Sequence, residues 1–450
     1  MAFPKMKRHV PVRVRQYWKL LVACGAFVVA LTVAFSTVRV HPYVTSASDQ
    51  SADDASEDLQ GLRDVFDASV AHSIKLTYKP DDYQRMLATF SSAGNKDYLE
   101  ADLVLDGTAI PSVGIRLKGN STLRGFGRTS LDSSRAETMP WLIRFDKFVP
   151  GRRYQGLREI AVRVAGMNGG STVMNEAVTL DVLARAGEPA ERYSYASFVV
   201  NDRPATARLI VETPDKPLAA RMAGKGVLYK ALSSGQFTDQ GDDPVDYEDD
   251  FEQITRKGSQ DLQPVIDLVR WVSSAGDSSF AADLDEHVDV PSFARYAAAQ
   301  NLLLNFDDMA GPGKNYYLWY DLGTRKFSVI GWDYNLTFSG NASQDPHETS
   351  SRFGGGGPPG RGGGFGQSNP LKQRFLSGKS FTEAYDEAYR SLYRKIFASG
   401  QAMTSVDNVV KVLSTVKGSD PDAVAADAEQ LRSEIRQRTA YLSTNAVATG

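Results

Sequence analysis

The first half of the chain alternates hydrophobic and polar positions in the way that is typical of β-strands. Ile74, Leu76 and Tyr78 are each separated by one polar residue, so their side chains would share one buried face. A helical spacing of apolar residues interrupts this pattern over residues 80–90 and again over 172–185. The same alternation predicts further strands over residues 99–105, 113–117, 141–145, 157–164 and 195–212.

The second half carries the longer apolar period of amphipathic helices. We expect one short hairpin within it, with strands over residues 316–320 and 326–330 and a turn at Gly323. The chain is therefore predicted to be α+β, with a β-rich N-terminal lobe and a mainly helical C-terminal lobe. Helices are predicted over residues 262–273, 291–304, 381–398, 405–416 and 421–446.

A run without charged side chains near the N-terminus predicts a membrane anchor. Residues 20–38 are long enough to cross a hydrocarbon core of about 30 Å as one helix. Basic residues dominate the preceding segment, so the positive-inside rule would place that segment in the cytoplasm and the C-terminal domain outside. We therefore expect a single-pass protein of the cell membrane, or a secreted protein if cleavage occurs near residues 34–36. The predicted organisation is a basic cytoplasmic tail (1–19), a transmembrane helix (20–38), a flexible linker (39–65) and one folded domain (66–446).

Composition narrows the possible classes of function. The 450 residues carry a formal net charge of −3 and no polybasic stretch, so no nucleic-acid partner is expected. Cys24 is the single cysteine, which excludes an intramolecular disulfide and a cysteine-based zinc site. The histidines form no HExxH pattern and no GxSxG motif occurs, so the zinc-peptidase and serine-hydrolase classes lack their residues.

Residues 305–335 contain the most informative group of polar side chains. Asp307 follows an apolar helical run, Asn315 precedes the first strand of the predicted hairpin, and Asp333 follows the second strand. Phosphoryl-transfer sites use this layout, because one Asp receives the acceptor hydroxyl while an amide and a second carboxylate hold Mg²⁺ on the phosphates. The alternative is purely structural, since Asp and Asn also favour turns and strand ends.

Several motifs extend this pattern over most of the chain. Three segments of this chain together resemble the central signature of the CotH kinase family. They are NFD (305–307), NYYL (315–318) and WDYN (332–335). The likeness covers the chain from about residue 70 to residue 440, and it is specific because the motifs follow the order of the family. The other similar segments are IRLKGNST (115–122), PWLIRFDKF (140–148), GEPAERYSYASFVVND (187–202), GVLYK (226–230) and NPLKQRFL (369–376).

The resemblance implies an atypical, protein-kinase-like two-lobed fold that transfers phosphate from ATP to Ser or Thr of a protein. It implies that Asp307 is the catalytic base or substrate orienter and that Asn315 and Asp333 are ligands of Mg²⁺ or Mn²⁺. Asn335 stands where the family often has a second Asp, so the charge available to a second metal would be smaller. The expected partners are ATP, a protein substrate such as a cell-surface or coat protein, and the membrane through residues 20–38.

Four further residues are predicted to bind the nucleotide. Lys118, Arg144 and Lys230 are the candidate cations for the ATP phosphates, and Glu176 is the candidate ion-pair partner of whichever cation fills that role. Glu212, at the end of an apolar strand, is predicted to help bind the nucleotide or to cap a turn. Each residue also has an ordinary alternative as a solvent-facing side chain or part of a strand-end turn.

The roles of two segments are not assigned, and two alternative functions of the whole chain are considered. The acidic run 239–252 lacks the spacing of a calcium-binding loop and is expected to be a solvated loop or to recruit a basic substrate. The glycine-rich loop 353–366 has no strand close before it and no helix opening from it, so it is not a nucleotide-binding fingerprint. The chain could instead be a structural or interaction protein of the cell envelope with little catalysis, or a glycan hydrolase using Asp307 and Asp333 as acid and base.

Overall fold

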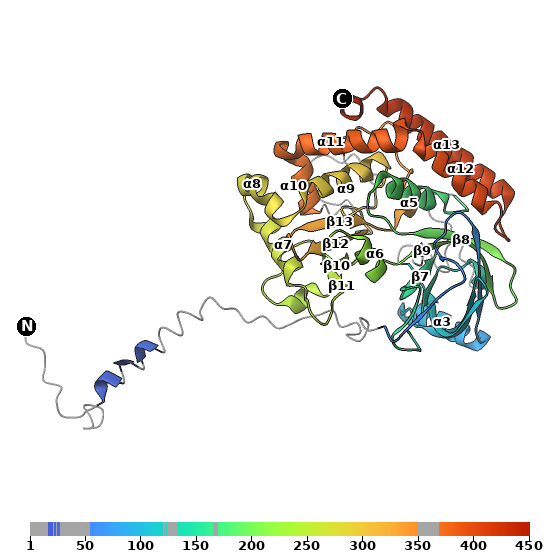
Figure 1. Cartoon of the computed structure of the whole chain (residues 1–450), viewed down its shortest axis with the longest axis horizontal. Helices are drawn as coiled ribbons and strands as arrows, with labels where there is room; N and C mark the ends of the chain where they lie inside the picture. The colour runs from blue at the N-terminus through green and yellow to red at the C-terminus, as the bar shows by residue number, and fades with distance from the viewer. Residues whose placement is uncertain are drawn as a thin grey trace, which may run out of the picture.

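Seven strands of the N-terminal half close into a barrel (Figure 1). The computed structural model describes residues 17–20, 22–23, 25–27, 55–119, 123, 134–164, 170–348 and 369–450. A parallel pairing between the first and last strands around the barrel completes the closure. In order around the barrel, the strands are β2 (Ala71–Thr77), β3 (Leu99–Leu105), β4 (Thr108–Leu117), β5 (Trp141–Arg144), β7 (Glu159–Val162), β9 (Thr206–Glu212) and β8 (Tyr193–Val200).

This closed barrel overturns the predicted protein-kinase-like two-lobed fold. Alternation located the strands because one face of each is apolar, and Ile74, Leu76 and Ile115 are buried inside the barrel. A period of two does not say which strand pairs with which. The closing pair brings Ala71 opposite Tyr195, two residues that are far apart in the sequence. The fold class could therefore not be obtained from the periodicity of single segments.

The predicted transmembrane helix over residues 20–38 is not supported. Within that span the structure describes residues 20, 22–23 and 25–27, and the remainder lies outside the described residues. Among the described residues, no helix is both long and apolar enough to cross a membrane. The prediction of a single-pass membrane protein is withdrawn on this finding. Most of the predicted tail (1–19) and linker (39–65) also lies outside the described residues.

Short elements surround the barrel. Strand β1 (Glu57–Leu59) pairs in parallel with β6 (Arg152–Tyr154). Helix α3 (Pro80–Ala93) begins with proline in its first turn and ends at Gly94, which has a φ of 73°. Its side chain Tyr83 packs on Trp141 of the barrel core, with 5.8 Å between the ring centroids. These contacts fix the helix on the barrel.

A four-stranded antiparallel sheet follows the barrel along the chain and positions the residues of interest. Its strand order is β11 (Phe251–Gln253), β10 (Gly226–Ala231), β12 (Tyr316–Asp321) and β13 (Phe327–Gly331). Strands β12 and β13 correspond to the predicted hairpin. Their register places Tyr316 opposite Gly331, and the backbone N–H of Trp332 donates to the carbonyl of Asn315 at 3.2 Å. Asn315, directly before β12, and Asp333, shortly after β13, therefore lie at the same end of the hairpin.

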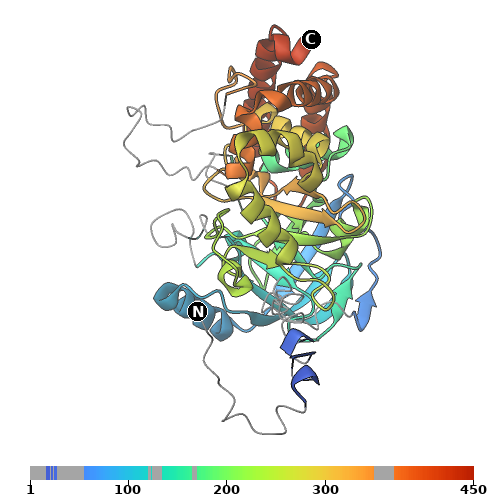
Figure 2. The same cartoon turned by 90° about the vertical axis from the view of Figure 1, so that its left-hand side faces the viewer.

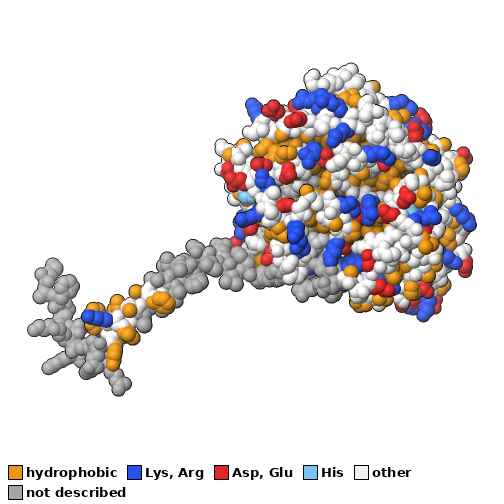
Figure 3. Space-filling model, viewed as in Figure 1, with side chains coloured by type: hydrophobic (Ala, Val, Ile, Leu, Met, Phe, Trp, Pro, Cys, Tyr) orange, Lys and Arg blue, Asp and Glu red, His pale blue; other side chains and the backbone are white. Residues whose placement is uncertain are grey.

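Helices cover this sheet and continue to the C-terminus. Figures 1 and 2 show the barrel at one end of the molecule, the sheet in the middle and the last helices at the other end. Acidic and basic side chains are interspersed over the face in Figure 3. The helices are α5 (Met174–Ala186), α6 (Lys216–Arg221), α7 (Gln263–Ser274), α8 (Asp277–His287), α9 (Val290–Leu302), α10 (Pro370–Ser377), α11 (Thr382–Tyr393), α12 (Gln401–Leu413), α13 (Pro421–Leu442) and α14 (Ala446–Thr449).

Helix α5 differs from the others because it is buried on nearly all sides. Figure 1 shows it between the barrel and α12, and its hydrophobic side chains belong to the main core of the second half. A helix that is apolar on most faces is expected in such an interior position. Glu176 is the one charged residue of α5 that is buried. It therefore requires a partner within the protein.

A buried arginine on α13 fixes the end of α9. The Arg438 side chain is fully buried and donates to the carbonyl of Gln344 at 2.5 Å, to the side-chain oxygen of Asn301 at 2.9 Å and to the hydroxyl of Tyr389 at 2.7 Å. Asn301 lies in the last turn of α9, directly before the loop that contains Asp307. Arg438 thus connects α13 to the end of α9, where that loop begins.

We expect Arg438→Met to lower the free energy of unfolding by about 3–5 kcal/mol, because several buried acceptors would lose their donor at once. Urea unfolding followed by circular dichroism measures this change. Arg436→Met is the matched control, since Arg436 lies on the same helix and its ion pair with Glu429 is largely exposed. An equal effect of both substitutions would contradict the assigned role of Arg438.

Candidate functional site

The loop after α9 holds Asp307 in place through a chain of hydrogen bonds. Leu304 has a φ of 54°, which turns the chain sharply away from the helix. The buried amide of Asn305 donates to the side chain of Gln300 at 2.8 Å, and its oxygen accepts from the backbone N–H of Asp307 at 3.2 Å. The position of the Asp307 carboxylate is therefore set by the backbone and by a buried amide.

The Asp307 carboxylate is bound from one side by the loop that follows it. The backbone N–H of Gly313 donates to Oδ1 at 2.5 Å, and the Nδ2 of Asn315 donates to Oδ2 at 3.0 Å. A side chain at Gly313 would collide with the carboxylate, because a Cβ there would lie 2.6 Å from Oδ2. Burial, with smaller effects from Asp333 and Asp308, raises the pKa of Asp307 to about 6. The group is thus ionised at neutral pH but close to the range in which it takes up a proton.

The neighbouring Asp308 has a different environment. Its carboxylate is buried, pairs with the ammonium of Lys372 on α10 and accepts from the backbone N–H of Ala310 at 2.8 Å. Lys372 belongs to the NPLKQRFL motif, so this ion pair explains how that motif supports the loop. Asp308 therefore has a structural partner, whereas Asp307 accepts hydrogen bonds from backbone and amide N–H groups.

Asp333 lies directly after β13 and beside Asn315. Its backbone has a φ of 59°, a left-handed conformation that is uncommon for a residue other than glycine and that occurs often at functional sites. Its side chain is 28% exposed and forms an ion pair with Arg163, with 2.9 Å between Oδ1 and Nη1. The structure thus brings Asp307, Asn315 and Asp333 together.

Arg163 is the residue of this site that the sequence did not reveal. It follows β7, and its Nη2 donates to Oε1 of Glu176 at 2.6 Å. Its guanidinium also lies over the ring of Trp332, with 5.2 Å to the centroid. Burial raises the pKa of Glu176 to about 7, although the adjacent arginine acts in the opposite direction. The sequence offered one indirect signal, the prediction that Glu176 is the ion-pair partner of a nucleotide-binding cation.

Lys118, one of the predicted phosphate-binding cations, lies near Asp333, and a second, Lys230, lies near Lys118. The ammonium of Lys118 lies over the ring of Trp332, with 5.0 Å to the centroid. Burial, followed by the nearby positive charge of Arg163, lowers the pKa of Lys118 to about 7. Lys230 on β10 also contributes to this lowering, which places it in the same electrostatic neighbourhood. An incoming anion would favour the charged form of Lys118.

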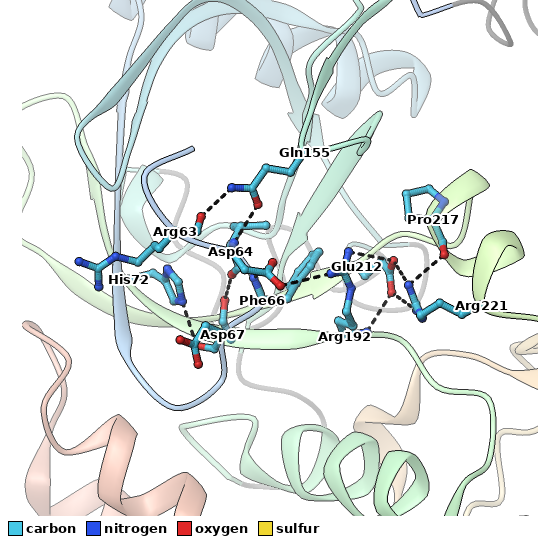
Figure 4. Close-up of polar contacts among 12 residues, drawn as sticks. Arg63, Asp64, Phe66, Asp67, His72, Gln155, Arg192, Glu212, Pro217 and Arg221 are labelled. Atoms are coloured by element: carbon cyan, nitrogen blue, oxygen red, sulfur yellow. Dashed lines mark hydrogen bonds and ion pairs between the residues drawn. The ribbon is translucent and has the colours of Figure 1, made fainter. Parts of the chain in front are cut away.

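Arg144 and Glu212 are not brought to Asp333. Arg144 is the last residue of β5, and its Nε is 2.5 Å from the carboxylate of Asp146. Glu212 is buried within a separate polar network, shown in Figure 4, where it pairs with Arg221 at 2.5 Å and accepts from the backbone N–H of Arg192 at 3.0 Å. Both predicted nucleotide-binding residues therefore have structural partners elsewhere.

The residues present suit a hard divalent cation only in combination with other ligands. Among the described residues, no three or more His, Cys, Asp or Glu side chains come together in a way that could hold a metal ion. Asp333 and Asn315 offer oxygen ligands, and Oδ1 of Asp333 lies close to Arg163 but accepts no hydrogen bond from the described residues. Mg²⁺ is commonly held by one or two carboxylates together with substrate phosphates and water. The pair thus fits a metal whose remaining ligands are water molecules and the phosphates of a nucleotide.

A cavity of about 320 Å³ opens on the other side of the same loop. Met309, Lys314 and Tyr316 line it from the segment that also carries Asn315. The predicted acidic run contributes Asp250, whose carboxylate accepts from the backbone N–H of Gln236 at 2.6 Å. Asn335 lies in the turn after Asp333, and the glycine-rich loop 353–366 lies outside the described residues.

Comparison with known proteins gives two findings. A family model described as "CotH kinase protein" matches residues 115–442. A curated protein from Bacillus subtilis (strain 168), "Inner spore coat protein H", is 24% identical over 197 residues, which cover 42% of this chain. The matched part spans 53% of that relative, or about half of its length. The matched range of the family model includes Lys118, Arg163, Asp307 and Asp333.

Proposed function

Because the chain belongs to the CotH kinase protein family, we propose that it transfers the terminal phosphoryl group of ATP to a Ser or Thr hydroxyl of a coat or envelope protein. The observation that carries this proposal is the adjacency of Asp307, Asn315 and Asp333. These residues supply a carboxylate that is held by neutral N–H donors, beside a pair of oxygen ligands suited to a metal. Kinases rely on this combination.

Each residue has a defined task in the proposed reaction. Asp307 accepts the proton of the acceptor hydroxyl while that oxygen bonds to the γ-phosphorus and the bond from phosphorus to the ADP oxygen breaks. Asp333 and Asn315 would hold Mg²⁺ or Mn²⁺, which when bound neutralises charge on the phosphates. Lys118 lies near Asp333, Lys230 lies near Lys118, and both would bind phosphate oxygens. Asn315 also orients Asp307 through its Nδ2.

Nucleotide binding tests this proposal before any acceptor is known. ATP with Mg²⁺ should raise the melting temperature of the full-length protein, and Lys118→Gln should weaken ATP binding about 10- to 100-fold, as expected for a lost charge-assisted hydrogen bond. Isothermal titration calorimetry measures the affinity. Lys75→Gln is the matched control, because Lys75 is an exposed strand lysine on β2.

A wild-type protein that binds no ATP with either Mg²⁺ or Mn²⁺ would refute the kinase proposal. The protein would then be a coat or envelope component that keeps the family fold without catalysis. Equal affinities of wild type and Lys118→Gln would instead remove Lys118 from the phosphate site.

A further inference from the structure

Arg163 occupies a position between two carboxylates that come from different parts of the fold. Its Nη2 contacts Glu176 on α5 at 2.6 Å, and its Nη1 contacts Asp333 after β13 at 2.9 Å. The guanidinium plane lies over Trp332, on whose ring Lys118 also lies. The Arg163 side chain is only 9% exposed. A guanidinium presents several N–H donors in one plane. When a buried carboxylate holds one of its nitrogens, the other terminal nitrogen can exchange one acceptor for another.

The contact between Nη2 of Arg163 and Glu176 is the fixed one. Glu176 is 1% exposed and lies on a helix buried on nearly all sides, so its carboxylate depends on Arg163 for a charged partner. The Asp333 side chain is 28% exposed, and its Oδ1 lies 2.9 Å from Nη1 of Arg163 without accepting a hydrogen bond from the described residues, whereas Glu176 accepts one from Nη2 at 2.6 Å. The contact between Arg163 and Asp333 is therefore the weaker of the two and the one that a ligand can replace.

We propose that Arg163 is a positioning residue that serves as a replaceable counterion of Asp333. In the protein without ligands its guanidinium neutralises the carboxylate that would hold the metal. A divalent cation at Asp333 would repel the guanidinium at this short distance, so Nη1 would leave Asp333 while Nη2 stays on Glu176. The released N–H groups would then donate to a phosphate oxygen of the nucleotide. This inference rests on the proposed function and adds a residue to it.

Binding of Mn²⁺ alone and of ATP with Mg²⁺ separates this role from a merely structural one. The double variant Arg163→Met, Glu176→Gln removes both charges of the buried pair, so that no lone carboxylate is left in the interior. It should bind Mn²⁺ about 3- to 5-fold more tightly than wild type, because the competing cation is gone. It should bind ATP with Mg²⁺ about 10- to 100-fold more weakly, because a phosphate donor is gone.

Electron paramagnetic resonance of free Mn²⁺ measures the first affinity, and calorimetry measures the second. Arg163→Lys keeps the charge and should leave Mn²⁺ affinity near that of wild type, and Arg85→Met is a control at an exposed arginine on α3. Weaker binding of both ligands in the double variant, or no change in either, would overturn the proposal. If wild type binds Mn²⁺ but not ATP, the proposed kinase function fails, while the Mn²⁺ affinities still decide whether Arg163 competes at Asp333.

Discussion

Replacing Asp307 with asparagine is expected to lower the rate of phosphoryl transfer by about 10²- to 10⁴-fold, the usual effect of losing a general base. Asparagine keeps the size of the side chain and its oxygen can still accept from the backbone N–H of Gly313, but its amide nitrogen cannot accept from Asn315 and the side chain cannot take up a proton. ATP binding should change little, since Asp333 and Asn315 would hold the metal. Initial rates with labelled ATP, together with ATP affinity by calorimetry, measure the two effects separately.

Asp308→Asn is the control for this substitution. Asp308 is paired with Lys372, so its replacement should lower the melting temperature rather than the rate per folded molecule. A transfer rate that falls only in Asp308→Asn would move the catalytic role to Asp308. Full activity of both variants would show that neither Asp307 nor Asp308 takes part in phosphoryl transfer.

Replacing Asp333 with alanine is expected to abolish the metal-dependent part of ATP binding while the protein stays folded. The carboxylate would supply the direct negative charge on the metal, and Asn315 alone offers a neutral oxygen. The measurement is the rise in melting temperature caused by ATP with and without Mg²⁺. Wild type should show a larger rise with Mg²⁺, and Asp333→Ala should show no difference.

Asp267→Ala serves as the matched control, because Asp267 is an exposed carboxylate on α7. Its response to ATP and Mg²⁺ should equal that of wild type. The same Mg²⁺-dependent rise in Asp333→Ala as in wild type would show that the metal is held elsewhere.

The sequence was most informative where the site is built from one short segment. Asp307, Asn315 and Asp333 lie on either side of a single hairpin, so their adjacency follows from the turn at Gly323 and the register of β12 with β13. Glu176 was predicted as the ion-pair partner of a nucleotide-binding cation, and the structure pairs it with Arg163, which is not one of the predicted cations. Local pattern was therefore sufficient to place Asp307, Asn315 and Asp333 near one another, whereas their roles in the reaction stay predictions.

Features that depend on distant contacts could not be obtained in this way. The barrel closes through β2 and β8, and no local period encodes that pairing. Arg163 was missed because its two carboxylate partners lie on α5 and after β13, so nothing in its own segment marks it. Arg144 contacts Asp146, two residues away on the same segment, and its predicted role in ATP binding stays a prediction. Prediction from one segment at a time therefore locates local contacts and misses distant ones.

The central claim is that the full-length protein is a phosphotransferase that depends on Asp307. The most direct measurement is incubation with γ-labelled ATP and Mg²⁺ or Mn²⁺, with the protein itself and coat or envelope proteins as acceptors, followed by identification of the labelled residue. We predict metal-dependent label on Ser or Thr with wild type and almost none with Asp307→Asn. Absence of label with either metal from a wild-type protein that binds ATP, or equal label with Asp307→Asn, would contradict the claim.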